Sequence, residues 1–236
     1  MTKTPRRVAV VTGANRGLGK AIAHDLAAAG LHVVVTSRTE QAAQSAAEEF
    51  QREGLAASAH QLDITDPASV ARTMADVGFT YGRLDVLVNN AAVAIDRGQL
   101  AAAADMEKVC ATLNTNLMGA WRCCTAAIPE MKRNDYGRIV NVTTHMSTSA
   151  NLGVGSVAYR TSKAALNALT RILATELQAD NILVNAASPG KVDTRLAYGK
   201  ADRQPSEATD TFVWLATLPD NGPSGQLFFD GKLLEW

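Results

Sequence analysis

The chain has 236 residues, of which 47% are hydrophobic and 19% are charged, a composition typical of a soluble domain with a sizeable core. Its 23 basic residues balance its 23 acidic residues, so no overall charge favours nucleic acid or a membrane surface as a partner. No apolar run approaches the roughly 20 residues that a membrane span needs. We therefore expect a cytoplasmic protein.

The three cysteines, Cys110, Cys123 and Cys124, show no regular spacing, which argues against a disulfide framework. We expect free thiols that are buried or half-buried. The four histidines form no cluster with cysteines at ligand spacing, so we expect no metal site.

Short apolar runs alternate along the chain with longer segments of helical periodicity. The predicted strands are residues 8–12, 32–36, 57–61, 84–88, 138–142, 182–186 and 226–229. The predicted helices are residues 17–29, 39–53, one beginning at 66–67, one from about 105 to 124 or 131, 157–177 and 206–215. Strands that are apolar on both faces, each followed by a helix, indicate a parallel sheet covered on both sides. The sequence predicts one α/β domain over residues 1–236: a Rossmann-type doubly wound parallel sheet of about seven strands, flanked by helices on both faces.

A glycine-rich turn follows the first predicted strand. It spans residues 12–19 and places Gly13, Gly17 and Gly19 at the start of a helix. Glycine permits positive φ and a close approach of a ligand to the backbone. A helix N-terminus adds free N–H groups and a partial positive charge. This placement predicts a site for the pyrophosphate of a dinucleotide, although the spacing G-x-x-x-G-x-G differs from the common G-x-G-x-x-G fingerprint.

The end of the second predicted strand indicates which dinucleotide binds. Ser37 and Arg38 stand there, and no carboxylate follows until Glu40. An acidic residue at this place would accept hydrogen bonds from the ribose of NAD, whereas arginine accommodates the phosphate of NADP. Arg16, inside the turn, lies in the same neighbourhood. We expect NADP(H); the alternative is that both arginines are solvated surface residues.

Tyr159 and Lys163 are four residues apart in a predicted helix, so both side chains lie on one face. A carbonyl that accepts a hydride must also be protonated, and a free tyrosine has a pKa near 10, too high for facile exchange at neutral pH. A nearby ammonium group stabilises the phenolate, as would the positive nicotinamide ring, so we expect the pKa of Tyr159 to be lowered. The pair predicts acid/base chemistry.

These motifs resemble those of the short-chain dehydrogenase/reductase family, in which the turn reads T-G-x-x-x-G-x-G and the catalytic pair reads Y-x-x-x-K. The resemblance covers residues 8–229, with five motifs in family order. It implies a compact, single-domain, carbonyl reductase-like oxidoreductase.

The resemblance implies four catalytic residues. Tyr159 corresponds to the general acid/base, and Lys163 to a lysine that also holds the nicotinamide ribose. Asn116 corresponds to an asparagine that holds a water between the lysine and solvent. Thr144 stands where the family has a catalytic serine, and it keeps the hydroxyl donor. Ser147, three residues further on, is the rival for that role.

The resemblance also implies a lining for the cofactor. Asp63 would lie beside the adenine, although a plain turn residue is nearly as good a reading, and Asn89 would brace the sheet. Thr194 would contact the nicotinamide carboxamide or the pyrophosphate. Ala92 replaces a family glycine, which strains the backbone if that position needs positive φ. The full predicted cofactor set is Gly13, Asn15, Arg16, Gly17, Leu18, Gly19, Ser37, Arg38, Asp63, Ile64, Asn89, Ala91, Tyr159, Lys163, Pro189, Gly190, Val192 and Thr194.

We expect an NADP(H)-dependent oxidoreductase that reduces a ketone or an aldehyde. The small-molecule substrate would lie over the carboxyl ends of the strands, between residues 94–97, 145–154 and 196–203. Arg195, Lys200 and Arg203 are solvated residues of a lid or meet an anionic group. Family members are often dimers or tetramers, so we expect a homodimer or homotetramer. Its interface would include the face of the long predicted helix that carries Ala164, Ala165, Ala168 and Leu169.

Two other functions stay open. One is a catalytically silent NADP(H)-binding regulatory or scaffold protein, which the departures at Thr144 and Ala92 motivate. The other is a secondary alcohol dehydrogenase that runs in the oxidative direction, because the same site works both ways.

Overall fold

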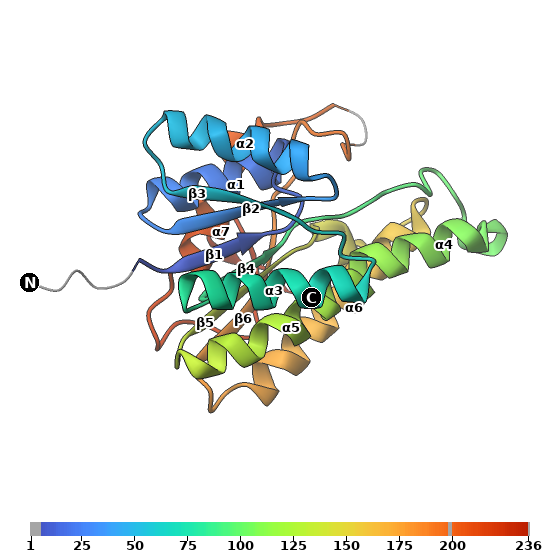
Figure 1. Cartoon of the computed structure of the whole chain (residues 1–236). Coiled ribbons are helices and arrows are strands. Elements are labelled where there is room, and N and C mark those ends of the chain that lie inside the picture. The colour runs from blue at the N-terminus through green and yellow to red at the C-terminus, as the bar shows by residue number, and fades with distance from the viewer. Residues whose placement is uncertain (1–5, 198–199, 236) are drawn as a thin grey trace, which may run out of the picture.

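The computed structural model describes residues 6–197 and 200–235. Eight strands form one sheet in the order β3-β2-β1-β4-β5-β6-β7-β8 (Figure 1). The strands are β1 (Val8–Val11), β2 (His32–Ser37), β3 (Ala57–Gln61), β4 (Val86–Asn89), β5 (Gly137–Val142), β6 (Ile182–Ser188), β7 (Leu227–Phe229) and β8 (Lys232–Leu233). All neighbours pair in parallel except β7 and β8. The doubly wound parallel fold is confirmed; the eighth strand is a two-residue antiparallel addition, too short to give a sequence signal.

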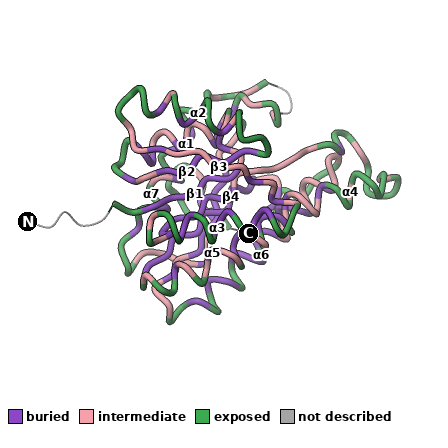
Figure 2. The backbone as a smooth tube through the Cα atoms, in the orientation of Figure 1, coloured by how far each residue is buried: buried purple, intermediate pink, exposed green. Residues whose placement is uncertain are grey.

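Helices cover both faces of the sheet. The α-helices are α1 (Gly17–Ala28), α2 (Glu40–Arg52), α3 (Pro67–Tyr81), α4 (Met106–Leu113), α5 (Ala120–Arg133), α6 (Val157–Glu176) and α7 (Asp210–Ala216). One core joins α1, α2 and α7 to the sheet through residues such as Ile22 and Phe212. The other joins α3, α5 and α6 through residues such as Met74 and Leu166. Figure 2 shows the strands buried between these layers, as expected for runs that are apolar on both faces.

Two predicted helices are interrupted in the structure. The predicted helix from residue 105 is α4, then a π-helical segment, η2 (Asn114–Gly119), then α5. The predicted helix at 206–215 is a 3₁₀ turn, η5 (Pro205–Ala208), followed by α7. Apolar periodicity does not reveal either break, because it reports which residues face the core and not the hydrogen-bonding pattern of the backbone. Cys123 and Cys124 are buried as expected, but Cys110 is exposed, because it lies on the outer face of α4.

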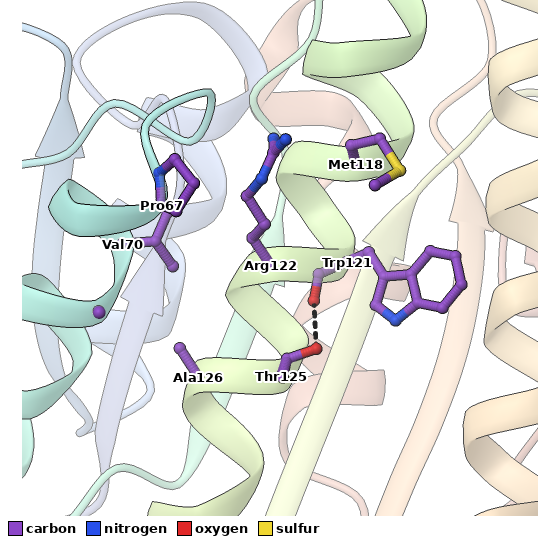
Figure 3. A pocket seen from close by; sticks show the side chains of 8 residues that line it. Pro67, Val70, Met118, Trp121, Arg122, Thr125 and Ala126 are labelled. Carbon is purple, nitrogen blue, oxygen red and sulfur yellow. Dashed lines mark hydrogen bonds between the residues drawn. The ribbon is translucent and has the colours of Figure 1, made fainter.

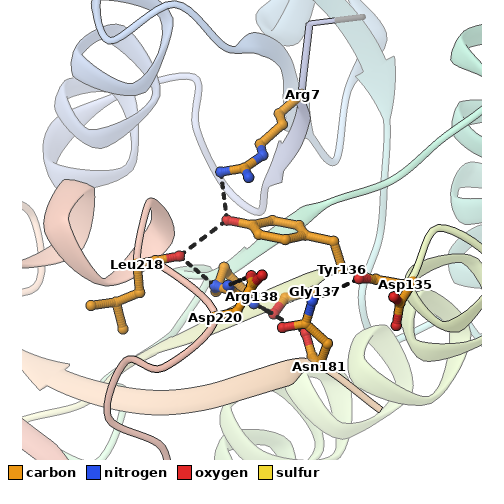
Figure 4. A network of polar contacts seen from close by, with 8 residues as sticks. All are labelled: Arg7, Asp135, Tyr136, Gly137, Arg138, Asn181, Leu218 and Asp220. Carbon is orange, nitrogen blue, oxygen red and sulfur yellow. Dashed lines mark hydrogen bonds and ion pairs between the residues drawn. The ribbon is translucent and has the colours of Figure 1, made fainter. Parts of the chain in front are cut away.

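The amino-terminal edge of the sheet is closed by a polar network (Figure 4). Arg138, at the start of β5, is fully buried and donates to the Leu218 carbonyl at 2.8 Å and to the Asp220 carboxylate at 2.9 Å. The Tyr136 ring lies between two guanidinium groups, with the Arg7 and Arg138 Cζ atoms 3.8 and 3.9 Å from its centroid. These structural contacts occupy the amino-terminal edge around Arg138, and the predicted site residues follow the carboxyl ends of the strands, at the opposite edge.

The order of the strands also points to that opposite edge. The chain runs outward from β1 through β2 to β3 and then returns to place β4 beside β1. In open parallel sheets, the crevice at such a reversal, outside the carboxyl ends of the strands, is where ligands bind. Among the helices of residues 6–197 and 200–235, none has the length and apolar character that crossing a bilayer requires.

Candidate active site

The glycine-rich turn lies between β1 and α1, at the carboxyl edge of the sheet. Gly13 and Gly17 have φ values of 64° and 55°, a region that side chains with a Cβ rarely adopt. Arg16 is the N-cap of α1, in extended conformation, and makes no side-chain cap hydrogen bond. The first N–H groups of α1 therefore have no capping side chain, and they fit an anionic ligand such as a pyrophosphate.

Asn90, which the sequence motifs do not mark, holds this turn in place. Its side-chain amide donates to the carbonyl oxygens of Thr12, at 2.9 Å, and Gly13, at 3.2 Å. A Cβ on Gly19 would lie 2.6 Å from the Gly13 oxygen and would overlap the Asn90 amide. Gly19 is therefore required by packing against Asn90. The only available signal was the adjacency of two asparagines at the end of a strand.

The end of β2 lies beside the glycine-rich turn. The Thr36 carbonyl accepts from the Ala14 backbone N–H at 2.8 Å, which ties the two segments together. Ser37 is buried, whereas Arg16 and Arg38 are both exposed, and neither forms an ion pair among the described residues. Their guanidinium groups are thus available to an added anion.

Asp63 lies at the end of β3, near Arg38. Its carboxylate accepts from the Thr65 hydroxyl at 2.7 Å and from the Thr65 N–H at 2.9 Å. These hydrogen bonds, and the positive charge of Arg38, lower the pKa of Asp63 below its usual value. Ile64, next to it, packs against Gly119, where any Cβ would lie 2.7 Å from the Ile64 side chain.

Residues at and just after the end of β4 join the turn to the sheet. Asn89 donates to Asn141 at 2.9 Å and so links β4 to β5. Ala91 packs against Gly13, with an ideal Gly13 Cβ only 3.1 Å away. Ala92 does not have positive φ, so the alanine in place of the family glycine causes no backbone strain.

Tyr159 and Lys163 lie in the first turns of α6. Lys163 is buried, and its Nζ donates to the Val142 carbonyl at 2.7 Å. Burial raises the pKa of Tyr159 from 10.0 to about 12 and lowers that of Lys163 from 10.5 to about 8. The expected lowering of the Tyr159 pKa is therefore wrong for the chain by itself, because the loss of hydration on burial disfavours the phenolate.

Thr144 and Ser147 follow β5 but point to different surroundings. Thr144 is the N-cap of a 3₁₀ turn, η3 (His145–Ser147), and its Oγ1 accepts from the Met146 N–H at 3.3 Å. Ser147 is buried against α6, where it accepts from Asn167 at 3.1 Å and donates to the Thr144 carbonyl at 2.6 Å. The Ser147 hydroxyl also lies 3.2 Å from the Thr143 hydroxyl, so its three hydrogen-bond partners are all internal.

Asn116 lies in the middle of the π-helical segment η2. Its Oδ1 accepts from the Val93 N–H at 2.8 Å, and its Nδ2 donates to the Val93 carbonyl at 2.9 Å and to the Ser162 hydroxyl at 3.1 Å. The side chain thus connects η2 to the loop after β4 and to α6. A π-helical turn shifts the backbone ladder, and such turns occur often at functional sites.

The loop after β6 returns to the glycine-rich turn. Gly190 has a φ of 74°, and Val192 is buried. Thr194 packs against the turn: a Cβ on Gly17 would lie 3.5 Å from the Thr194 Cγ2. Of the two contacts expected for Thr194, this placement favours the pyrophosphate.

Side-chain bonds already occupy part of the expected substrate walls. Arg97 donates to the Arg195 carbonyl at 2.7 Å, and Arg203 forms a bidentate ion pair with Asp230 at 2.7 and 2.8 Å. Arg203 is therefore a structural residue and is not free to meet an anionic substrate. Residues 198–199 of the third wall lie outside the described residues.

A separate apolar pocket of about 390 Å³ lies between α3 and α5 (Figure 3). It is lined by Pro67, Val70, Ala71, Met118, Trp121, Arg122, Thr125 and Ala126. None of these residues belongs to the predicted site, and the pocket contains no catalytic pair. Its size alone does not make it the site of the chemistry.

The chain belongs to the short-chain dehydrogenase family, since the family model described as "short chain dehydrogenase" matches residues 7–205. It is 34% identical to "Carbonyl reductase [NADPH] 1" of Mus musculus, over 98% of this chain and 99% of that protein. The protein of the same name from Homo sapiens is also 34% identical, over 97% and 98%. Among solved structures, a metagenomic short-chain oxidoreductase in complex with NADP has a TM-score of 0.80 and 30% identity, covering 92% of this chain and 93% of that one.

Proposed function

We propose that the protein is an NADP(H)-dependent carbonyl reductase that converts a ketone or an aldehyde to an alcohol. The observation that carries this proposal is the bond from the buried Lys163 Nζ to the Val142 carbonyl, which ties the helix of Tyr159 to the end of β5, two residues before Thr144. The glycine-rich turn follows β1 at the same edge of the sheet. The 34% identity to carbonyl reductases over nearly the whole chain supports it.

NADP(H) fits the residues of this edge. The uncapped start of α1 and the packing of Thr194 against Gly17 provide a cradle for a pyrophosphate. Arg16 and Arg38 supply charge for a ribose phosphate. Most remaining members of the expected lining lie in the same turn, at the start of α1, or at and after the carboxyl ends of β2, β3, β4 and β6, whereas Tyr159 and Lys163 lie on α6. When bound, the nicotinamide supplies the hydride.

Side chains of this chain carry out the proton transfer. Tyr159 donates a proton to the oxygen of the reduced carbonyl, and Thr144 polarises that oxygen by a hydrogen bond. Burial moves the pKa of Tyr159 up to about 12 and that of Lys163 down to about 8, so both charged forms are disfavoured separately. A phenolate and an ammonium formed together would stabilise each other in this dry setting. Asn116 holds the loop after β4 and η2 beside α6.

The test is NADPH oxidation against a panel of aldehydes, simple ketones, quinones, diketones and cyclic ketones. Tyr159→Phe is run beside Tyr81→Phe, which removes a hydroxyl on α3 that donates to the Ser58 hydroxyl, away from the proposed site. Turnover that disappears in Tyr159→Phe and persists in Tyr81→Phe supports the proposal. Absence of turnover, with NADPH still raising the melting temperature, would instead favour a silent NADP(H)-binding protein.

We also propose a homodimer or homotetramer formed through α5 and α6. Trp121 on α5 and Met118 on η2 are exposed large apolar side chains, and Ala168 is exposed on α6. Leu169, expected on the same face, is instead buried in the core of the chain. Light scattering after size exclusion gives the mass; a monomer at all concentrations would contradict this proposal. A cytoplasmic location and a single domain over residues 1–236 stay predictions.

A further inference from the structure

The helix that carries Tyr159 begins without a local cap. Ser156, its N-cap, lies in the left-handed region, with φ 49° and ψ 47°, and its side chain makes no cap hydrogen bond. A residue with a Cβ is strained in this region, and the first N–H groups of a helix need acceptors. The start of α6 therefore depends on an acceptor from elsewhere in the chain.

That acceptor is Asp96, in the loop after β4. Its Oδ2 accepts from the Ala158 N–H at 2.6 Å and from the Tyr159 N–H at 3.3 Å. A carboxylate at a helix N-terminus also interacts favourably with the helix dipole. Asp96 thus binds the backbone of the residue that we propose as the proton donor.

Asp96 is more deeply buried than the aspartates that cap α3 and α4. The side chain is fully buried, and its second oxygen, Oδ1, has no hydrogen-bond partner among the described residues. The caps of α3 and α4, Asp66 and Asp105, lie at exposed positions, and Asp105 also forms an ion pair with Lys108. A buried carboxylate with an unpaired oxygen costs stability. Stability of the helix alone does not account for that arrangement.

The loop that carries Asp96 is fixed at three points around the site. Asn116 forms hydrogen bonds with the backbone N–H and carbonyl of Val93. Asp96 accepts from the backbone at the start of α6, and Arg97 donates to the Arg195 carbonyl in the loop after β6. Movement of this loop would therefore displace the start of α6 relative to η2 and to the loop after β6.

We propose that Asp96 is a positioning residue for the reaction: by binding the backbone N–H groups of Ala158 and Tyr159, it sets the height of the Tyr159 hydroxyl above the sheet edge. This inference rests on the proposed role of Tyr159. Asp96 touches neither substrate nor cofactor and acts through α6.

The experiment compares Asp96→Ala, Asp96→Asn and the control Asp66→Ala, which removes the side-chain cap of α3. At a temperature where all variants are folded by circular dichroism, Asp96→Ala is expected to lower kcat at least about 10-fold, with the NADPH Kd within about 2-fold of the parent. Asp96→Asn keeps an acceptor oxygen and is expected to restore most of kcat. Asp66→Ala is expected to leave kcat unchanged.

Amide hydrogen exchange separates this inference from the proposed function, because it needs no turnover. Asp96→Ala should lose protection at Ala158 and Tyr159, even if the parent reduces no carbonyl. If Asp96→Ala does not fold, Asp96→Glu displaces the carboxylate and should lower kcat in the same way. An unchanged kcat in the folded variant, or a parallel loss of kcat and NADPH affinity, would overturn the inference.

Discussion

The Ser147 hydroxyl donates a hydrogen bond to the Thr144 carbonyl at 2.6 Å. The same hydroxyl accepts from Asn167 on α6, so the backbone of Thr144 is fixed to the helix that carries Tyr159 and Lys163. The two hydroxyl residues that the sequence offers for one role therefore have different environments. Ser147 supports the backbone of Thr144, and Thr144 keeps its hydroxyl near the edge of the sheet.

The first prediction separates these two residues. Thr144→Ala should lower kcat by about 100-fold, the usual loss when one hydrogen-bond donor to a developing oxyanion is removed. Thr144→Ser should keep most of the activity, because it keeps the hydroxyl. Ser147→Ala should lower stability by about 1–2 kcal/mol, with a smaller loss of kcat. Steady-state kinetics and thermal melts measure both; a greater loss of kcat in Ser147→Ala would transfer the role to Ser147.

A second prediction concerns the glycine-rich turn. Gly19→Ala places a methyl group 2.6 Å from the Gly13 oxygen and against the Asn90 amide. We expect a loss of about 1–3 kcal/mol of stability and weaker NADPH binding, because the turn must shift. Fluorescence titration with NADPH measures the affinity. The control is Gly153→Ala, whose nearest neighbours would lie 3.9 Å away; similar NADPH affinities in both variants would contradict the proposed cradle.

The phosphate specificity can be tested at Arg38. Arg38→Asp replaces a positive charge by a negative one at the end of β2, so NADPH should bind about 10- to 100-fold more weakly, while NADH affinity stays or improves. Arg72→Asp, a reversal at another exposed arginine, on α3, should change neither affinity. Isothermal titration with both cofactors decides the matter: equal losses for NADPH and NADH would rule out a phosphate contact at Arg38.

The buried lysine predicts a pH-dependent stability. The pKa of Lys163 is about 8 in the folded chain and 10.5 without burial, so the protonated form costs the folded state about 3 kcal/mol below pH 8. This cost fades as the pH rises from about 8 to 10.5. Lys163→Met should therefore be more stable than the parent at pH 7, by somewhat less than that amount, because the bond to the Val142 carbonyl is lost.

Urea unfolding of the parent and of Lys163→Met at pH 7, 8 and 9 checks this prediction. The difference in the free energy of unfolding should shrink as the pH rises. A constant difference over this range would mean that Lys163 carries no buried charge in the folded chain.

The sequence predicts the sheet, its order of elements and most boundaries, because apolar β-branched strands and capped helices are local signals. The start of α3 is one such case: Asp66 and Pro67 mark it in the sequence, and the Asp66 side chain caps it in the structure. The π-helical segment η2 was not predictable, because its apolar spacing is also that of an ordinary helix.

The residues of the candidate site also differ in whether the sequence marks them. The glycines, Tyr159 and Lys163 are recognisable from their spacing, whereas Asn90 and Asp96 act only through contacts between distant segments. The pKa of Tyr159 was predicted with the wrong sign for the chain alone, because spacing reports the nearby lysine but not the burial of both groups.

The Arg138 network at the amino edge has a consequence for how this chain can change. The contacts that lock the scaffold lie at one edge, and the loops that would select a substrate lie at the other. Exchange of the loops before α4 and α6, with Asp96 kept to cap α6, is therefore separable from the folding of the sheet, which makes this chain a suitable starting point for engineered specificity.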